Sequence, residues 1–247
     1  MKNSTKKNTS DVIAFFLKEK KIKHVFGIIG SANAHIFESI RKLNYTKIVC
    51  VHHEQAATMA IQTYFRVTGK LSAALVTAGG ATANAITGVV SGWADSMPGI
   101  IISGQENSKF MNTHKDMRMW GIQGFDSVNM VKKVTKYSSR VLKSKNILFE
   151  LEKCFHISME GRRGPVWLDI PVDVQGEYIE NIDNLKKFKE KIVKDNITKN
   201  EFKKIIKLIN QSKRPVFWFG NGVRLSKSDK LIPKILKKFP FPFFLTW

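Results

Sequence analysis

Short apolar runs alternate with segments of helical periodicity along the chain as far as residue 179. The apolar runs are short enough to be strands and lie at residues 24–30, 47–51, 71–80, 98–105 and 164–171. The segments with helical spacing of apolar residues lie at 11–22, 32–43, 54–69 and 81–95. Ser10 is placed to cap the first of these helices, and Gly69 is placed to end the third. The pattern predicts alternating strands and helices.

The spacing of the predicted strands indicates how they pair. The first four begin about 25 residues apart, which suits a strand followed by a crossover helix. The strands are nearly unbroken apolar runs, as expected when helices cover both faces of a sheet. We therefore predict an α/β fold with a parallel sheet flanked by helices.

Four of the predicted strands are followed by loops of unusual composition. These loops are rich in glycine, serine, threonine, histidine or glutamate and lie at residues 27–31, 52–54, 77–82 and 103–106. In open parallel sheets, ligands bind outside the carboxyl ends of the strands. The sequence therefore predicts a binding site along this edge of the sheet.

The composition changes after residue 179. Residues 180–199 are strongly charged and are predicted to be a linker, so that 1–179 forms the first domain. Residues 200–247 then begin a second α/β domain, with a helix at 201–210 and a strand at 215–220. One or two β-α units cannot bury both faces of a parallel sheet, so this Rossmann-like domain is expected to be incomplete.

Composition and charge narrow the class of protein. Apolar residues make up 43% of the chain, which is enough for a core, and no stretch approaches the length of a membrane helix. The net charge of +21 is spread along the chain without a nucleic-acid-binding motif, which favours solvated lysines over a weak anion-binding surface. Cys50 and Cys154 lack metal-ligand spacing and are interpreted as reduced thiols. We expect a cytoplasmic protein that binds neither nucleic acid nor membrane.

Glu54 lies where a predicted strand ends and a predicted helix begins. One interpretation is a surface carboxylate that the positive end of the helix dipole favours. The other is a buried carboxylate that shares a proton with a nitrogen heterocycle, which is general acid–base chemistry. The adjacent His52 and His53 point to opposite sides of an extended segment and favour structural roles over a shared metal ion. The residues alone leave both interpretations of Glu54 open.

Gly79 and Gly80 close one strand and open the next helix. Glycines let a ligand approach the backbone, and a helix N-terminus offers free N–H groups to it. The alternative is a tight turn that needs glycine for its conformation.

Several segments together resemble a known family. They read HVFGIIGS, HHEQAATMAIQTYFRVTGK, LVTAGGATANAITGV, DSMPGIIISGQ and GPVWLDIPVDVQ, in that order. Their order and spacing resemble thiamine-diphosphate-dependent enzymes, in particular the large catalytic subunit of acetolactate synthases. The resemblance covers residues 10–179 as the family's N-terminal pyrimidine-binding domain. It continues through 200–247 as the opening of the family's central domain.

The resemblance implies roles for individual residues. In the family, the glutamate that matches Glu54 hydrogen-bonds N1′ of the cofactor's aminopyrimidine and so promotes removal of the thiazolium C2 proton. The residues implied to border the pyrimidine are Ile29, Gly30, Thr77, Gly79, Gly80 and Asn84. Gln105 matches a glutamine that faces the substrate. The implied function is a 2-oxo acid decarboxylating carboligase that acts on pyruvate in branched-chain amino acid biosynthesis.

The chain departs from the family pattern in three segments. Ile29-Gly30 replaces a proline-glycine pair, and the glycine loop at 78–84 reads AGGATAN rather than SGPGATN. The segment after Gln105 lacks the usual A-F-Q-E run. These departures leave the acceptor substrate open, with another thiamine-diphosphate-dependent decarboxylase or lyase subunit, or a non-catalytic fragment, as the alternatives.

The resemblance also implies parts that these residues do not contain. The family holds diphosphate and Mg²⁺ through a C-terminal Gly-Asp-Gly motif, which is absent from the sequence. We therefore expect the N-terminal part of such an enzyme, inactive alone, with its Mg²⁺ ligands in the missing domain and no metal ligand here. The resemblance implies a homodimer or homotetramer with active sites between subunits, and it leaves open whether FAD is bound.

Overall fold

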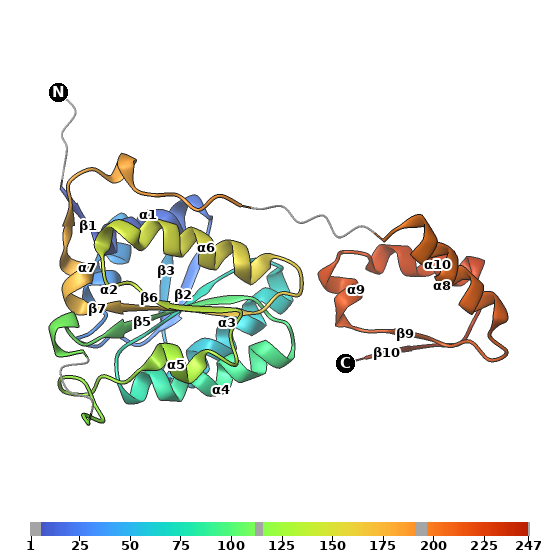
Figure 1. Cartoon of the computed structure of the whole chain (residues 1–247), viewed down its shortest axis with the longest axis horizontal. Helices are drawn as coiled ribbons and strands as arrows, with labels where there is room; N and C mark the ends of the chain where they lie inside the picture. Colours follow the sequence, from blue (N-terminus) through green and yellow to red (C-terminus); the bar gives the residue numbers. More distant parts are fainter. Residues whose placement is uncertain (1–5, 112–115, 191–196, 247) are drawn as a thin grey trace. The chain divides into compact units, whose positions relative to one another are not determined.

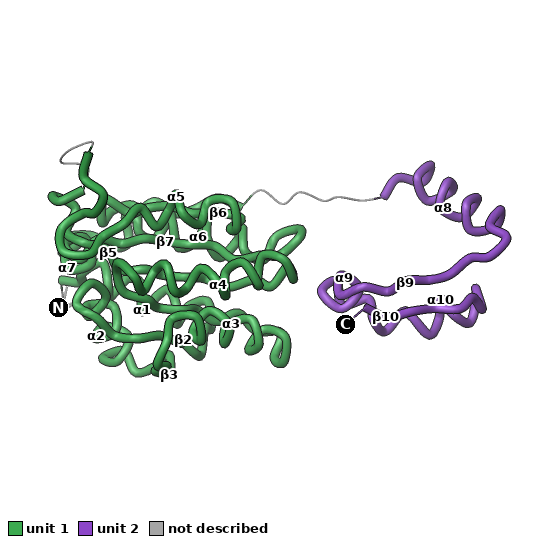
Figure 2. The backbone as a smooth tube through the Cα atoms, turned by 90° about the horizontal axis from the view of Figure 1, so that it is seen from below, with its two compact units in different colours: residues 1–190 green, residues 191–247 purple. Residues whose placement is uncertain are grey.

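The computed structural model describes residues 6–111, 116–190 and 197–246. The chain divides into two compact units, Met1–Glu190 and Lys191–Trp247 (Figure 2). Residues 191–196 of the predicted linker lie outside the described residues. The predicted domain boundaries stay predictions, and each unit is described by itself.

Unit 1 is built around a parallel sheet of six strands in the order β3-β2-β4-β5-β7-β6 (Figure 1). The strands are β2 (His24–Gly27), β3 (Lys47–Cys50), β4 (Ala73–Val76), β5 (Gly99–Gln105), β6 (Tyr137–Arg140) and β7 (Pro165–Pro171). Each neighbouring pair is parallel. The predicted α/β fold with a parallel sheet flanked by helices is therefore confirmed.

Helices cover both faces of this sheet (Figure 1). One face carries α1 (Thr9–Glu19), α2 (Ala34–Leu43), α6 (Ile147–Met159) and the short α7 (Val172–Gly176). The other carries α3 (Glu54–Thr68), α4 (Gly80–Ala94) and α5 (Ser127–Val131). Short 3-10 turns lie at η1 (Ser108–Phe110), η2 (Ser144–Asn146) and η3 (Ile182–Asn184). A separate antiparallel pair joins β1 (Lys7–Asn8) to β8 (Tyr178–Ile179).

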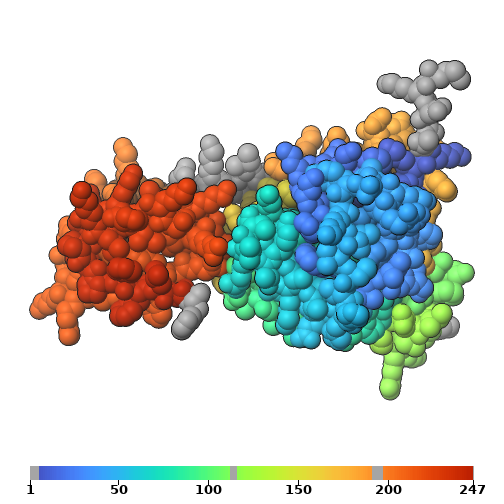
Figure 3. All heavy atoms as spheres, turned by 180° about the vertical axis from the view of Figure 1, so that it is seen from behind, coloured from blue at the N-terminus to red at the C-terminus, as the bar shows by residue number. Residues whose placement is uncertain are grey.

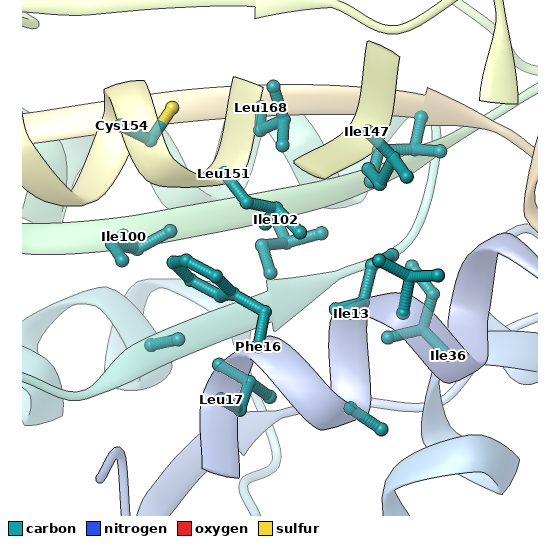
Figure 4. Packing of buried hydrophobic residues seen from close by; sticks show 14 of the residues in the cluster. Ile13, Phe16, Leu17, Ile36, Ile100, Ile102, Ile147, Leu151, Cys154 and Leu168 are labelled. Carbon is teal, nitrogen blue, oxygen red and sulfur yellow. The ribbon is translucent and has the colours of Figure 1, made fainter. Parts of the chain in front are cut away.

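A buried apolar cluster fills the space between the sheet and the helices of the first face (Figure 4). Phe16 of α1 lies between the two layers and meets Phe155 of α6 edge to face, with ring centroids 6.3 Å apart. Leu168 of β7 is fully buried in the same cluster. Burial of such side chains contributes about 1.5–3 kcal/mol each, so this layer is a main source of the stability of unit 1.

The expected cap of the first helix is wrong by two residues. Asn8 is the N-cap: its side chain accepts a hydrogen bond from the Asp11 amide, and the Asp11 carboxylate accepts one from the Asn8 amide. Ser10 is buried and donates instead to the carbonyl oxygen of Gln175, 3.0 Å away. Gly69 does end α3 in the left-handed conformation, as predicted.

Unit 2 contains a parallel pair of strands, β9 (Phe217–Phe219) and β10 (Phe243–Leu245). Its other elements are α8 (Lys199–Gln211), α9 (Asn221–Leu225), η4 (Asp229–Leu231) and α10 (Ile232–Lys238). None of its described helices contains a buried residue. Trp218 of β9 is 76% exposed and Phe244 of β10 is 64% exposed, so these two strands leave apolar surface uncovered within the unit.

Replacement of a core leucine should destabilise unit 1 far more than replacement of a surface leucine. We expect Leu168→Ala to lower the free energy of unfolding by about 2–5 kcal/mol, because it removes buried contacts and leaves a cavity. Leu142→Ala is the matched control, since Leu142 is 56% exposed, and it should cost much less. Urea unfolding of both variants measures the difference, and equal losses would contradict the packing described.

The two cysteines should differ in reactivity. Cys50 ends β3 and is exposed, whereas Cys154 of α6 is buried and burial raises the pKa of its thiol. A thiol reagent such as DTNB should therefore modify one thiol in the native chain and a second only after unfolding. Cys50→Ser should abolish the native reaction, and rapid native modification of both thiols would contradict the placement of α6.

Candidate functional site

The chain moves in opposite directions across the sheet from the neighbouring strands β2 and β4. The chain leaves β2 through α2 towards β3, whereas it leaves β4 through α4 towards β5 on the opposite face. Such a switch point leaves a crevice at the carboxyl ends of the two strands, where open α/β sheets bind ligands. Residues 28–33 and 77–79 lead away from the carboxyl ends of β2 and β4.

The two loops touch at this switch point. A Cβ atom at Gly30 would lie 2.6 Å from Thr77 Oγ1, so only glycine permits this approach. Asn33 pins the first loop: its Nδ2 donates to the Ile28 carbonyl at 3.0 Å, and its Oδ1 accepts from the Gly30 amide at 2.8 Å. Asn33 was not among the predicted residues; an asparagine just before a predicted helix is the only signal that the sequence offers for it. Ile29, between these anchors, is 60% exposed.

Glu54 is both the first residue of α3 and a buried carboxylate. Its side chain is only 8% exposed, and its Oε2 accepts a hydrogen bond of 3.0 Å from Asn84 Nδ2. His53 occupies the N-cap position, where its ring nitrogen accepts from the Gln55 amide. Glu54 therefore lies at the helix N-terminus but is not the surface carboxylate of the first interpretation, whereas its proton exchange with a heterocycle stays a prediction.

The pairing of Glu54 with Asn84 results from the close packing of α3 on α4. Thr58 donates to the Ala85 carbonyl at 3.0 Å, and a Cβ atom at Gly88 would overlap the same hydroxyl. One turn further along, Gln62 donates to the Gly88 carbonyl. The two helices thus run parallel in register, with their N-termini together at the carboxyl edge of the sheet.

Gly79 and Gly80 have different reasons to be glycine. Gly79 has φ of +76° and ψ of −131°, which only glycine adopts readily, and an added Cβ would lie 2.5 Å from the Gln123 carbonyl oxygen. Gly80 opens α4, is exposed, and has no atom within 4 Å of an added Cβ. The tight-turn interpretation therefore applies to Gly79, while Gly80 presents open backbone at a helix N-terminus.

Two polar atoms at this edge have spare hydrogen-bonding capacity. Thr77 Oγ1 is buried without a hydrogen-bond partner. Glu54 Oε1 accepts no hydrogen bond from the residues that the structure describes. An unsatisfied hydroxyl, a half-satisfied carboxylate and the open face of Gly80 fit a flat polar ring with nitrogen atoms at its edge.

Gln105 is placed differently from the other predicted site residues. It ends β5, is fully buried, and its Nε2 donates to the Phe125 carbonyl at 2.8 Å and to Asp169 Oδ2 at 3.1 Å. Its Oε1 accepts from the Glu106 amide at 3.0 Å. The side-chain amide of Gln105 is therefore hydrogen-bonded to other protein groups, and its substrate-facing role stays a prediction.

Residues 120–126 form a turn that covers Gly79, and we name it the covering turn. Trp120 and Gly124 exchange two backbone hydrogen bonds of 2.8 Å across it. Gln123 Nε2 donates to the Ala78 carbonyl at 3.3 Å, which places this residue against the glycine loop. Sequence reasoning missed Gln123, and its position between Gly121 and Gly124 in a long loop is only a weak signal.

Two further features concern residues 6–111, 116–190 and 197–246, which are the described part of the chain. Within it, no group of three or more histidine, cysteine, aspartate or glutamate side chains is arranged to hold a metal ion. None of the helices in residues 6–111, 116–190 and 197–246 has the length and apolar character needed to cross a bilayer.

Comparison with known families shows the family to which the chain belongs. Residues 7–130 match the model of the thiamine pyrophosphate enzyme N-terminal TPP binding domain. This segment contains β2 to β5, Glu54, Asn84 and the glycine loop. The chain belongs to the thiamine pyrophosphate enzyme family. The predicted resemblance is therefore confirmed.

Individual members of the thiamine pyrophosphate enzyme family match a longer stretch. The acetolactate synthase large subunit of Haemophilus influenzae is 30% identical over 240 residues, which are 94% of this chain and 40% of that protein. The corresponding subunit of Lactococcus lactis is 26% identical over 237 residues, with the same coverage. The mitochondrial acetolactate synthase of Schizosaccharomyces pombe is 27% identical over 243 residues, 94% of this chain and 35% of that protein. The chain thus spans about 40% of the length of these bacterial relatives.

Alanine at the two adjacent glycines should change the stability of this family member to very different extents. Gly79→Ala should lower the free energy of unfolding by at least about 2 kcal/mol, because alanine neither adopts this backbone conformation nor fits against Gln123. Gly80→Ala, the matched control, should change it by less than about 0.5 kcal/mol. Urea unfolding curves check both values. Equal stabilities of the two variants would show that the covering turn does not lie on Gly79.

Proposed function

We propose that this chain is the pyrimidine-binding part of an enzyme that decarboxylates a 2-oxo acid and joins the product to a second carbonyl compound. The observation that carries the proposal is the buried Glu54 carboxylate, held on one oxygen by Asn84 at the carboxyl edge of the sheet. The relatives named acetolactate synthase support this reaction and support pyruvate as its substrate. Thiamine diphosphate, when bound, supplies the electron sink for decarboxylation.

Each site residue then has a role in holding the aminopyrimidine. Glu54 holds a proton at ring nitrogen N1′ through its Oε1, and Asn84 keeps the carboxylate in place. Thr77 offers its unsatisfied hydroxyl, and Gly80 offers open backbone beside the ring. A buried carboxylate in a fixed position is suited to this proton transfer, because little reorganisation is needed at the moment of reaction.

The other predicted residues contribute mainly through the loops that they form. Ile29 and Gly30 approach the pyrimidine from the loop after β2, and Gly79 approaches it from the loop after β4. We retain Gln105 as a substrate-facing residue, a role that requires its amide to leave Phe125 and Asp169.

The proposal places further parts of the machinery outside these 247 residues. Mg²⁺ and the diphosphate group need oxygen ligands that we assign to the region of the relatives beyond the matched portion. We propose a homodimer or homotetramer in which the site lies between subunits. FAD stays an open alternative, and the cytoplasmic location stays a prediction.

A chimeric enzyme tests the role of Glu54. Residues 1–247 are joined to the remaining C-terminal portion of the Haemophilus influenzae large subunit and supplied with thiamine diphosphate, Mg²⁺ and pyruvate. We expect acetolactate as the product. Glu54→Gln should lower the rate by roughly 10²- to 10⁴-fold, because the amide cannot exchange the proton.

Glu38→Gln is the control for this substitution. Glu38 lies on α2 and pairs at the surface with Arg41, so its loss should leave the rate unchanged. A Glu54→Gln chimera with the full rate would contradict the proposed role, whereas an inactive parent chimera would favour a non-catalytic chain. Acetaldehyde in place of acetolactate would instead favour a simple 2-oxo acid decarboxylase.

A further inference from the structure

A buried charge network lies behind the cofactor site. Asp169 of β7 is fully buried, and its carboxylate accepts hydrogen bonds from Ser103 at 2.6 Å, Gln105 at 3.1 Å and Arg140 at 2.7 Å. Burial raises the pKa of Asp169, whereas the charge and hydrogen bonds of Arg140 oppose that shift. A buried carboxylate needs such partners, because an unpaired buried charge is strongly destabilising.

Arg140 connects this network to the covering turn. Its Nε contacts Asp169, and its second terminal nitrogen donates to Asp126 Oδ1 at 2.9 Å. Its guanidinium also lies over the Trp120 ring, 4.5 Å from the centroid. A planar guanidinium can bridge two carboxylates and stack on an aromatic ring at once, which an ammonium group cannot do. Arg140 thus contacts both ends of the covering turn.

Several hydrogen bonds stabilise the negative charge of Asp126 at the end of the covering turn. Asp126 caps α5, and its carboxylate also accepts from the Asn129 side chain at 2.6 Å. Partial burial pushes the pKa of Asp126 upward, but hydrogen bonds from Arg140 and Asn129 outweigh it and leave the pKa below its ordinary value. Asp126 is therefore ionised at neutral pH and attracts the guanidinium.

The middle of the turn faces the cofactor site. The Gln123 amide donates to Glu106 Oε1 at 3.2 Å, and the Gln123 side chain reaches the Ala78 carbonyl. Gln105 holds the Phe125 carbonyl from the other side. The chain around this turn, light green in Figure 3, lies at the periphery of unit 1.

We propose that Arg140 is a positioning residue: it clamps the covering turn to the buried end of β7 and so holds Gln123 against the Ala78–Gly79 turn of the site. The clamp stands on the contacts of Arg140 with Asp126, Asp169 and Trp120. Its consequence for catalysis rests on the proposed function, in which the turn forms one wall of the cofactor site.

Hydrogen–deuterium exchange of the full chain tests the clamp without any assumption about activity. Asp126→Asn is the first variant, because asparagine still caps α5 while the charge that pairs with Arg140 is lost. We expect amides of the covering turn to exchange roughly two- to fivefold faster, as for loss of a partly exposed ion pair. Peptides from β4 should exchange as in the original chain.

Arg140→Met is the stronger variant, and it should speed exchange in the covering turn by about tenfold or more. Since it also leaves Asp169 without its cation, it could unfold unit 1, and Asp126→Asn then decides alone. Arg41→Met is the matched control, because it removes a surface arginine–glutamate pair. Unchanged exchange in the turn of Asp126→Asn, or an equal increase in β4, would overturn the proposal.

Kinetics of the chimera test the consequence for the site. In Asp126→Asn, the thiamine diphosphate concentration for half-maximal rate should rise severalfold while kcat changes less, because the wall of the site is loosened and Glu54 is untouched. In Arg140→Lys, the thiamine diphosphate concentration for half-maximal rate should lie between the values of the parent chimera and of Asp126→Asn, since lysine can reach only one carboxylate. Unchanged cofactor dependence would overturn this consequence. If the parent chimera is inactive, the proposed function fails, whereas the exchange result still decides the clamp.

Discussion

The register between α3 and α4 is the constraint on which the site depends. Thr58 and Gln62 of α3 bond to backbone carbonyls of α4, and Gly88 removes the side chain that would hold the helices apart. Because both helices follow parallel strands, their N-termini lie at the same edge of the sheet. Glu54 and Asn84 therefore meet, although 30 positions separate them in the sequence. A larger residue at Gly88 would separate the helices and, with them, the carboxylate from its donor.

Two buried carboxylates at the same edge of unit 1 illustrate the difference between a structural and a chemical acid. Asp169 is saturated by a serine, an amide and a guanidinium, so it has little capacity for a ligand. Glu54 has one protein donor in the described structure and keeps an oxygen for something else. Both are shielded from water, and the number of partners decides their use. The first organises the loops behind the site, and the second is suited to proton transfer within it.

The glycine loop shows a similar division between folding and binding. The fold requires glycine at position 79, because the backbone conformation and the approach of Gln123 exclude a side chain. Gly80 is not required by any described neighbour, and it leaves the N-terminus of α4 open. The covering turn lies against Gly79, and Arg140 joins this turn to the buried Asp169 of β7. A few polar groups thus connect the glycine loop, the covering turn and β7.

The sequence by itself determined the fold of unit 1 and the position of Glu54 at a strand–helix junction, because apolar periodicity and glycine positions record which faces are buried. It did not reveal β6, whose residues Tyr137–Arg140 are polar and only half-buried at the sheet edge. It also misplaced the cap of α1, since the choice between Asn8 and Ser10 depended on Gln175, far along the chain. Only the tertiary structure decided that Glu54 is buried, that the Gln105 amide donates to Asp169, and that Gln123 packs against Gly79. These facts depend on contacts between distant segments, and local sequence patterns carry no record of such contacts.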